Sequence, residues 1–156
     1  MASSPATNDR WPIRPLRDAD TEECVRMMLA LFPDAAPEEV LSDIETVRNR
    51  SDAEIFVVER PGGTLAGFVE VGERAYADGC VTSPVGYIEA WYVDPDIRNH
   101  GYGRALLETA EAWARARGRR EMASDARLDN EASQRAHERS GYHEVDRAVQ
   151  YRKSLE

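Results

Sequence analysis

A short segment with two glycines and three potential cations offers the clearest chemistry in this sequence. Between a predicted strand and a predicted helix stand, in order, Arg98, Asn99, His100, Gly101, Tyr102, Gly103 and Arg104. Glycines let a backbone turn tightly and bring its N–H groups close to a ligand, and the positive end of the helix dipole lies at the same point. The segment therefore predicts an anion site, with a pyrophosphate as the expected ligand. A glycine-rich helix start without any ligand is the alternative that an isolated G-x-G pattern leaves open.

Two carboxylates offer a second kind of chemistry. Glu89 stands in an otherwise apolar strand and shares a face with Tyr87, Trp91 and Val93 by two-residue alternation. Burying a charge is costly unless it is paired, so this position indicates either a functional carboxylate or one paired with an arginine. Asp125 ends the next predicted strand. Because the carboxyl ends of neighbouring strands in open α/β sheets face one crevice, the two carboxylates are expected to share it.

The hydrophobic pattern predicts the elements that must position these residues. Strands are expected at Ile13–Leu16, Ile55–Glu59, Leu65–Val71, Val85–Val93 and Glu121–Asp125, with two short ones at Tyr142–Val145 and Ala148–Arg152. Helices are expected from Asp20 to Pro33, after Pro37, over Ala105–Arg117 and from about Asn130 to Ser140. This order predicts an α/β (α+β) fold, a single domain with one mixed sheet and helices on its faces.

Composition narrows the class of protein. The chain has 156 residues, and a loose polar tail (1–10) is expected to precede one domain (11–156). A net charge of −9 argues against nucleic acid and favours a cationic partner, although acidity can also serve solubility alone. No apolar run suits a membrane span and no export signal opens the chain, so a cytoplasmic location is expected. Cys24, Cys80 and the three histidines lack metal-ligand spacing, which predicts no metal site.

The glycine segment differs from the two best-known phosphate loops. Leu106 stands where the dinucleotide fingerprint needs a third glycine, and the Gly-Lys-Ser/Thr of a P-loop is absent. The segment resembles instead the R-x-x-G-x-G/A signature of the GNAT superfamily of acyl-CoA-dependent N-acetyltransferases. Ile88–Val93 with Asp94-Pro95 is similar to the superfamily's fourth strand and its turn. This resemblance implies a GNAT fold, a central strand splayed to admit acyl-CoA, and acetyl-CoA as cosubstrate.

Further segments resemble landmarks of one branch of that superfamily, the aminoglycoside 6'-N-acetyltransferases. They are Tyr76–Cys80, Ser83-Pro84, Glu89–Val93, Glu121–Asp125 and Tyr151–Lys153. The resemblance, which runs from about residue 12 to 153, implies acetyl transfer from acetyl-CoA to the 6'-amine of an aminoglycoside. The expected reaction is a direct attack of the amine on acetyl-CoA in a ternary complex, and the acetylation is expected to confer resistance. The expected assembly is a homodimer.

Roles for single residues follow from the same resemblance. Glu89 is expected to be the general base and a contact for the substrate's ammonium. Four further substrate contacts are implied: Phe32, Tyr76, Asp125 and Asp146. Asp146 corresponds to a residue that reaches the neighbouring subunit's site, and a solvated surface carboxylate is the alternative there. Phe32 falls where relatives have a tryptophan.

The cofactor side of the site is implied in the same way. Trp91, Tyr92 and Val93 are expected along the pantetheine arm, and the backbone N–H groups of Tyr92 and Val93 are expected to stabilise the oxyanion. His137 takes the place of the superfamily's general-acid tyrosine, and a histidine packed between helix and sheet is the alternative. Asn130 corresponds to a pantetheine contact, and a plain helix cap would look the same.

Two other functions remain open from the sequence. One is a GNAT enzyme for a different amine, such as a polyamine or a peptide, because an acidic cleft suits any cation. The other is a non-catalytic acyl-CoA-binding domain, against which Glu89 argues.

Overall fold

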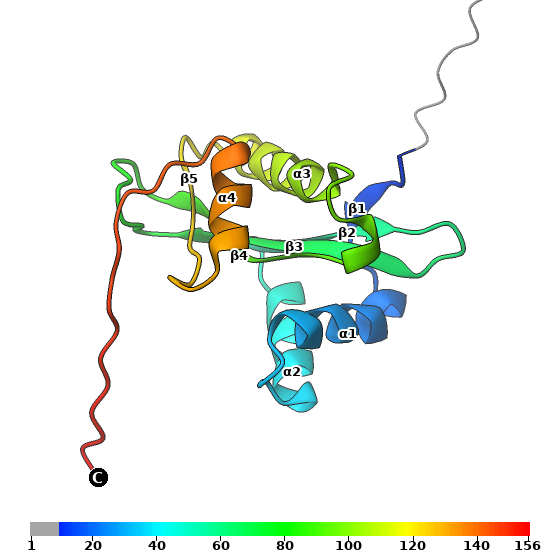
Figure 1. Cartoon of the computed structure of the whole chain (residues 1–156), viewed down its shortest axis with the longest axis horizontal. Coiled ribbons are helices and arrows are strands. Elements are labelled where there is room, and N and C mark those ends of the chain that lie inside the picture. Colours follow the sequence, from blue (N-terminus) through cyan, green and yellow to red (C-terminus); the bar gives the residue numbers. More distant parts are fainter. Residues whose placement is uncertain (1–9) are drawn as a thin grey trace, which may run out of the picture.

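The computed structural model describes residues 10–156 and shows a five-stranded sheet with helices on both faces (Figure 1). The strands, in sheet order, are β1 (Ile13–Pro15), β2 (Ala53–Glu59), β3 (Leu65–Arg74), β4 (Val85–Val93) and β5 (Met122–Ser124). The helices are α1 (Thr21–Leu31), α2 (Pro37–Arg48), α3 (Tyr102–Ala116) and α4 (Glu131–Arg139). Strands β1 to β4 are antiparallel and β5 is parallel to β4, which confirms the predicted mixed sheet.

The alternating side chains of β3 separate two hydrophobic cores. Phe68 packs with α1 and α2 on one face, whereas Val69 and Val71 pack under α3 on the other. All three side chains are fully buried, as expected for the middle of a sheet that is covered on both faces. The helix pair lies below the sheet in Figure 1, and α3 and α4 lie above it.

Strands β4 and β5 diverge. They pair only over Gly86–Ile88 and Met122–Ser124, and residues 89–93 of β4 continue beyond the last pair. The side of β4 that faces away from β3 is therefore open along these residues. This agrees with the splayed central strand that the sequence implied.

A bulge interrupts the pairing of β3 with β4. Glu70 is opposite Ala90 and Val71 is opposite Ile88, so Glu89 is an extra residue in β4. A bulge of this kind bends its strand and redirects the side chains beside it. The bulge lies where β4 leaves β5. It interrupts the two-residue alternation, so Trp91 and Val93 pack on the α3 side and the prediction that they share a face with Glu89 is wrong.

The two short strands predicted at Tyr142–Val145 and Ala148–Arg152 are wrong. Residues 142–156 form no strand and run along the end of the sheet and away from it, as the red trace in Figure 1 shows. Val149 and Tyr151 expose 69% and 92% of their surface. The β-forming residues suggested strands, but a strand needs a hydrogen-bonded neighbour and this segment has none within residues 10–156. The boundary between tail and domain stays a prediction, because residues 1–9 lie outside the described part.

Candidate active site

The start of α3 has the geometry of an anion site. The helix begins at Tyr102, three residues earlier than the sequence pattern predicts, and Gly101 precedes it with φ +86°. Asn99 also has a positive φ, of 63°. The first N–H groups of a helix have no intrahelical partner, and Gly101 has no side chain to cap them. These groups and the helix dipole are therefore available to an anion.

Trp91 fixes this loop against β4. Its indole Nε1 donates a hydrogen bond of 3.0 Å to the carbonyl oxygen of Gly103. A Cβ atom at Gly103 would lie 3.2 Å from Cζ2 of the same indole, which is tighter than nine in ten such contacts. A side chain at this position would therefore push the tryptophan ring away by a few tenths of an ångström. Trp91 packs on the α3 side of the sheet, and only its backbone borders the open side of β4.

The open side of β4 carries one suitably directed backbone donor. Asp94 N–H donates to Ala66 O of β3 at 2.7 Å. Successive residues of a strand direct their backbone groups to opposite sides, so the N–H of Tyr92 also faces β3 and that of Val93 faces the open side. Arg98 Nε donates to Val93 O at 2.9 Å, which agrees with this direction. Of the two donors predicted for the oxyanion, the geometry favours Val93.

The remaining side chains of the glycine segment have other surroundings. Tyr102 points toward the residues that precede β1, where its hydroxyl accepts a hydrogen bond of 3.1 Å from the backbone N–H of Trp11. Arg104 pairs with Glu108 one turn along α3, and His100 is exposed.

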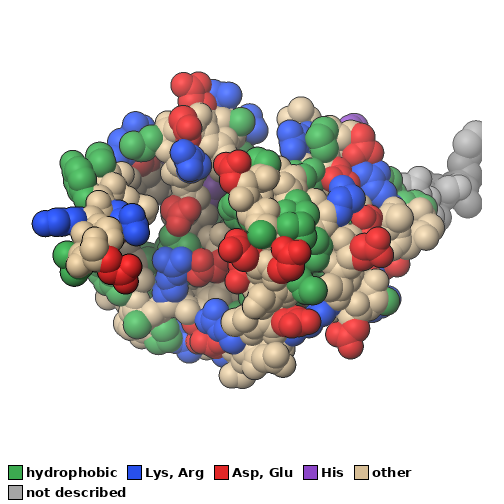
Figure 2. Space-filling model, turned by 90° about the horizontal axis from the view of Figure 1, so that it is seen from below, with side chains coloured by type: hydrophobic (Ala, Val, Ile, Leu, Met, Phe, Trp, Pro, Cys, Tyr) green, Lys and Arg blue, Asp and Glu red, His purple; other side chains and the backbone are tan. Residues whose placement is uncertain are grey.

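A chain of contacts joins the two predicted carboxylates on the α1 and α2 face of the sheet. Arg74 of β3 donates to both oxygens of Glu89, at 2.8 and 2.7 Å. The same guanidinium lies 3.5 Å from the ring centroid of Tyr87, whose hydroxyl donates to Asp125 at 2.6 Å. Figure 2, which looks at this face, shows acidic and basic side chains in and around a hollow. The arginine pairing that the sequence left open for Glu89 is present, but 27% of the Glu89 side chain remains exposed.

The other predicted substrate contacts are more scattered. Tyr76 is 69% exposed and donates to Asp78 at 3.0 Å, and this bond, with the nearby charges of Asp78 and Asp146, raises the pKa of its hydroxyl. Asp146 lies on the exposed C-terminal segment, next to Val145, which packs over the loop of Tyr76. Phe32 ends α1 and is 47% exposed. Among the described residues, no side-chain hydrogen bond or ring contact joins Phe32 to Glu89 or Asp125.

His137 is packed between α4 and the sheet and Asn130 caps α4, as the structural alternatives to a cofactor role predicted. Nε2 of His137 is 2.8 Å from Ser124 Oγ, and Nδ1 is 2.7 Å from Ser133 O. The ring packs edge-on against Trp91, with centroids 5.2 Å apart. Asn130 Oδ1 accepts the Ser133 N–H at 3.1 Å and caps α4. The roles proposed for both residues toward the cofactor stay predictions.

The sequence did not single out Arg74 or Glu70. Arg74 falls at the end of a strand, where a charged residue is ordinary, so no local pattern marks its pairing with Glu89. Glu70 did carry a signal, because it interrupts a buried strand just as Glu89 does.

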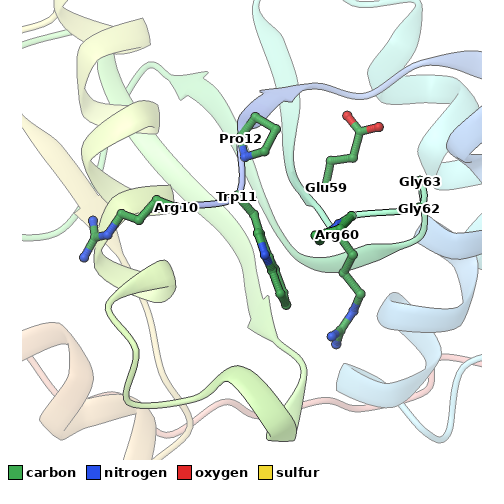
Figure 3. Close-up of a pocket in the computed structure, with 8 residues that line it drawn as sticks. Arg10, Trp11, Pro12, Glu59, Arg60, Gly62 and Gly63 are labelled. Atoms are coloured by element: carbon green, nitrogen blue, oxygen red, sulfur yellow. The ribbon is translucent and has the colours of Figure 1, made fainter. Parts of the chain in front are cut away.

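A separate hollow lies beside the β2–β3 turn and the start of β1 (Figure 3). Its volume is about 780 Å³, and Arg10, Trp11, Glu59, Arg60, Gly62 and Gly63 line it. The Arg60 guanidinium lies 5.2 Å from the Trp11 ring centroid. None of the predicted site residues lines this hollow, so it is separate from Glu89 and Asp125.

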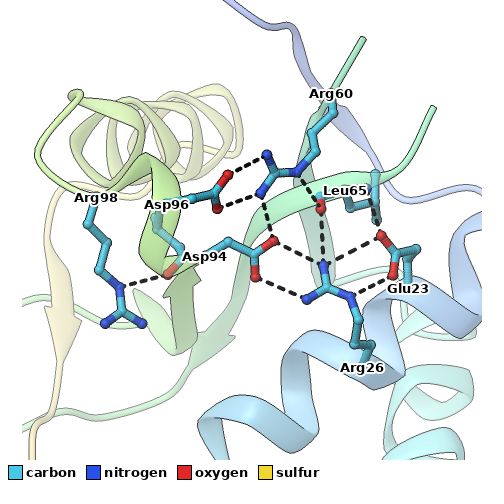
Figure 4. A network of polar contacts seen from close by, with 8 residues as sticks. Glu23, Arg26, Arg60, Leu65, Asp94, Asp96 and Arg98 are labelled. Atoms are coloured by element: carbon cyan, nitrogen blue, oxygen red, sulfur yellow. Dashed lines mark hydrogen bonds and ion pairs between the residues drawn. The ribbon is translucent and has the colours of Figure 1, made fainter. Parts of the chain in front are cut away.

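A network of ion pairs holds the end of β4 in place (Figure 4). Asp94, only 6% exposed, accepts hydrogen bonds from Arg26 of α1 and from Arg60. Arg26 also pairs with Glu23, and Arg60 with Asp96. The network links α1, the β2–β3 hairpin and the turn that leads into the glycine segment.

Comparison with known proteins identifies the family. The Acetyltransferase (GNAT) family model matches residues 16–142. The chain belongs to this family. It is 37% identical over 92% of its length to an "Aminoglycoside N(6')-acetyltransferase type 1" of Klebsiella aerogenes, of which 96% is covered. A relative of the same name from Stenotrophomonas maltophilia is also 37% identical, over 100% of this chain and 97% of its own.

Solved structures agree with this assignment to the GNAT acetyltransferases. The aminoglycoside antibiotic 6'-N-acetyltransferase AAC(6')-Ih from Acinetobacter baumannii matches with a TM-score of 0.86 and 27% identity, over 93% of this chain and 99% of that one. AAC(6')-Iy in complex with the bisubstrate analogue CoA-S-monomethyl-acetylneamine matches with a TM-score of 0.87 and 29% identity, over 94% and 100%. The predicted GNAT fold and acetyltransferase class are confirmed.

Within residues 10–156, no group of three His, Cys, Asp or Glu side chains could hold a metal ion. No helix in the same residues is long and apolar enough to cross a membrane.

Proposed function

We propose that this GNAT enzyme is an aminoglycoside 6'-N-acetyltransferase that transfers an acetyl group from acetyl-CoA to the 6'-amine and thereby confers resistance. The similarity to aminoglycoside N(6')-acetyltransferases over nearly the whole of both chains carries the proposal. The site supports it in chemical terms. Glu89 and Asp125 place two carboxylates on the hollowed face, where a polycationic sugar would bind.

The residues that would hold acetyl-CoA fit its anionic and extended parts. The N-terminus of α3 with residues 98–104 would bind the pyrophosphate. The open side of β4 would accept the pantetheine arm as an added strand. When bound, acetyl-CoA supplies an activated thioester.

Each part of the chain then has a separate task. Glu89 and Asp125 hold the substrate's ammonium groups and orient one of them toward the open side of β4. Val93 N–H stabilises the negative charge that develops on the acetyl carbonyl oxygen. His137 would protonate the departing thiolate. Because Ser124 and Ser133 occupy both ring nitrogens, this role requires one of those hydrogen bonds to break.

The exposed C-terminal segment supports a homodimer. Val149, Tyr151 and Leu155 leave at least 69% of their surface exposed, and the segment meets no strand of its own sheet within residues 10–156. Covering it with a second copy would bury these side chains and bring Asp146 into the partner's site. Sedimentation of the full chain should show a dimer, and removal of residues 147–156 should yield a monomer. A full-length monomer at micromolar concentration would contradict this assembly.

A cytoplasmic location is proposed as well. Both cysteines are free thiols, as is usual in a reducing compartment. Retention of activity in the cytosolic fraction of the source cells, and its absence from the medium, would test this.

An acceptor panel tests the function. Thiol release from acetyl-CoA is followed with kanamycin, tobramycin, spermidine and a lysine peptide. The proposal predicts release with the two aminoglycosides at a kcat/KM at least tenfold above that for the other amines. Preference for spermidine or the peptide would assign the enzyme to another amine. Acetyl-CoA binding without release for any amine would indicate a non-catalytic domain.

A further inference from the structure

Glu70 is a carboxylate without a partner in the middle of β3. It is half-buried and alternates with Phe68, so it faces α1 and α2. Its neighbours across the sheet, Ile55 on β2 and Ala90 on β4, are apolar. Within residues 10–156, no hydrogen bond or ion pair reaches its carboxylate. A charge in such a place is costly when no hydrogen bond or ion pair compensates it.

The bulge in β4 brings Glu89 beside Glu70. The irregularity between the two strands falls at Glu70 and Val71, opposite the extra residue Glu89. The two carboxylates differ in their partners, because Arg74 holds both oxygens of Glu89 and leaves Glu70 untouched. Neighbouring carboxylates in unlike environments commonly divide the work of binding charge and of carrying protons.

Charged groups from several elements act on Glu70. Burial raises its pKa to about 7, and the negative charges of Glu89 and of Asp43 on α2 act in the same direction. Arg50, just after α2, opposes them. On α1 the neighbouring group is Cys24, a buried thiol whose own pKa is raised. A group that titrates near neutrality can both accept and release a proton during turnover.

We propose that Glu70 is the proton acceptor of the transfer reaction, beside the ammonium-binding Glu89. This inference rests on the proposed function and assigns the base of that site to a different residue from the one that the family resemblance suggests. The N–H bond of the substrate's ammonium breaks, the proton passes to the Glu70 carboxylate, and the electron pair stays on nitrogen. The neutral amine then attacks the thioester carbon, the C–N bond forms, and the C–S bond breaks to release the thiolate. The second proton of that nitrogen leaves with the thiolate as free thiol, and Glu70 returns its proton to water.

Substitution of Glu70 tests this role. Glu70→Gln should lower kcat at least tenfold with kanamycin and leave the calorimetric affinity for acetyl-CoA unchanged. It should also abolish the inflection near pH 7 in kcat/KM, whereas Glu70→Asp should keep that inflection at a reduced rate. Glu54→Gln, on the neighbouring strand β2, is the matched control and should behave as the wild type. Circular dichroism checks that each variant is folded.

The outcomes separate this role from the function on which it rests. Thiol release by the wild type together with unchanged kcat in Glu70→Gln would overturn the role of Glu70 alone. No release by the wild type with any amine would overturn both. Carboxyl carbon NMR of the free wild-type protein gives a second readout, with the Glu70 signal assigned from its loss in Glu70→Gln. Titration of that signal near 7 supports the role, and titration near the ordinary 4.5 contradicts it.

Discussion

Replacing Asp94 by asparagine should destabilise the fold by about 2–3 kcal/mol. The carboxylate is 6% exposed and accepts two hydrogen bonds from Arg26, at 3.0 and 3.1 Å, and one from Arg60 at 3.0 Å. Breaking a buried ion pair by removing one charge costs about 3–5 kcal/mol. The cost expected for Asp94→Asn is lower, because Arg26 is 44% exposed and Arg60 keeps its ion pair with Asp96.

The pH dependence of this loss has a definite sign. Burial alone would raise the pKa of Asp94, but the hydrogen bonds from Arg26 and Arg60 outweigh it and lower the pKa below 3.8. A carboxyl whose folded-state pKa is depressed contributes stability above its unfolded pKa and loses it as the pH falls through the folded one. The difference between wild type and Asp94→Asn should therefore be full at pH 7 and shrink below about pH 4.

Urea unfolding followed by circular dichroism measures both effects. Asp96→Asn is the matched control, because Asp96 pairs with the same Arg60 but is 61% exposed, so its loss should destabilise the fold much less than the loss of Asp94. Unfolding slopes that match the wild type would show that the native and unfolded states are otherwise unchanged. If Asp94→Asn loses no more than Asp96→Asn, the network does not hold the end of β4 as described.

Three further predictions concern the site. Gly103→Ala places a methyl group 3.2 Å from the Trp91 ring and should weaken acetyl-CoA binding by at least about tenfold in calorimetry; wild-type affinity would show that the loop adapts. Tyr87→Phe removes the 2.6 Å bond to Asp125 and should raise the aminoglycoside KM about three- to tenfold with little change in kcat; an unchanged KM would remove Asp125 from binding. The folded-state pKa of Glu70 is raised from 4.5 to about 7. The stability that the protonated carboxyl contributes is therefore fully present below pH 4.5 and is lost as the pH rises through about 7. Glu70→Gln avoids this loss and should exceed the wild type by about 1–2 kcal/mol at pH 8 in urea unfolding, with no gain near pH 4.5; equal stability at both pH values would contradict the burial of this charge.

Local patterns predicted the sheet and the strand–loop–helix of the glycine segment well. Helices and strands up to residue 140 depend on periodicity, caps and turns, which are properties of short segments. The glycine segment and its helix are also contiguous, so their local geometry could be predicted from the sequence. The predicted start of α3 at Ala105 is wrong, because the helix begins at Tyr102, directly after Gly101, and includes Gly103 and Arg104 in its first turn.

Interactions between distant segments could not be predicted in the same way. The pairing of Arg74 with Glu89 depends on the register of β3 and β4, and the approach of Glu70 to Glu89 depends on a bulge. The sequence of each strand does not by itself say which residues lie opposite each other or where the bulge falls. The prediction of two strands in the C-terminal segment failed for a related reason. Strand propensity does not say whether a neighbouring strand is present to pair with.

The position of the acetyl group on the product tests the proposed specificity for the 6'-amine. The protein is incubated with acetyl-CoA and kanamycin, and the product is examined by two-dimensional NMR. Paromomycin, which has a hydroxyl group at 6', serves as the control acceptor. We expect a single acetyl group on the 6'-nitrogen of kanamycin and no acetylation of paromomycin. Acetylation of another amine, or of both antibiotics equally, would contradict it.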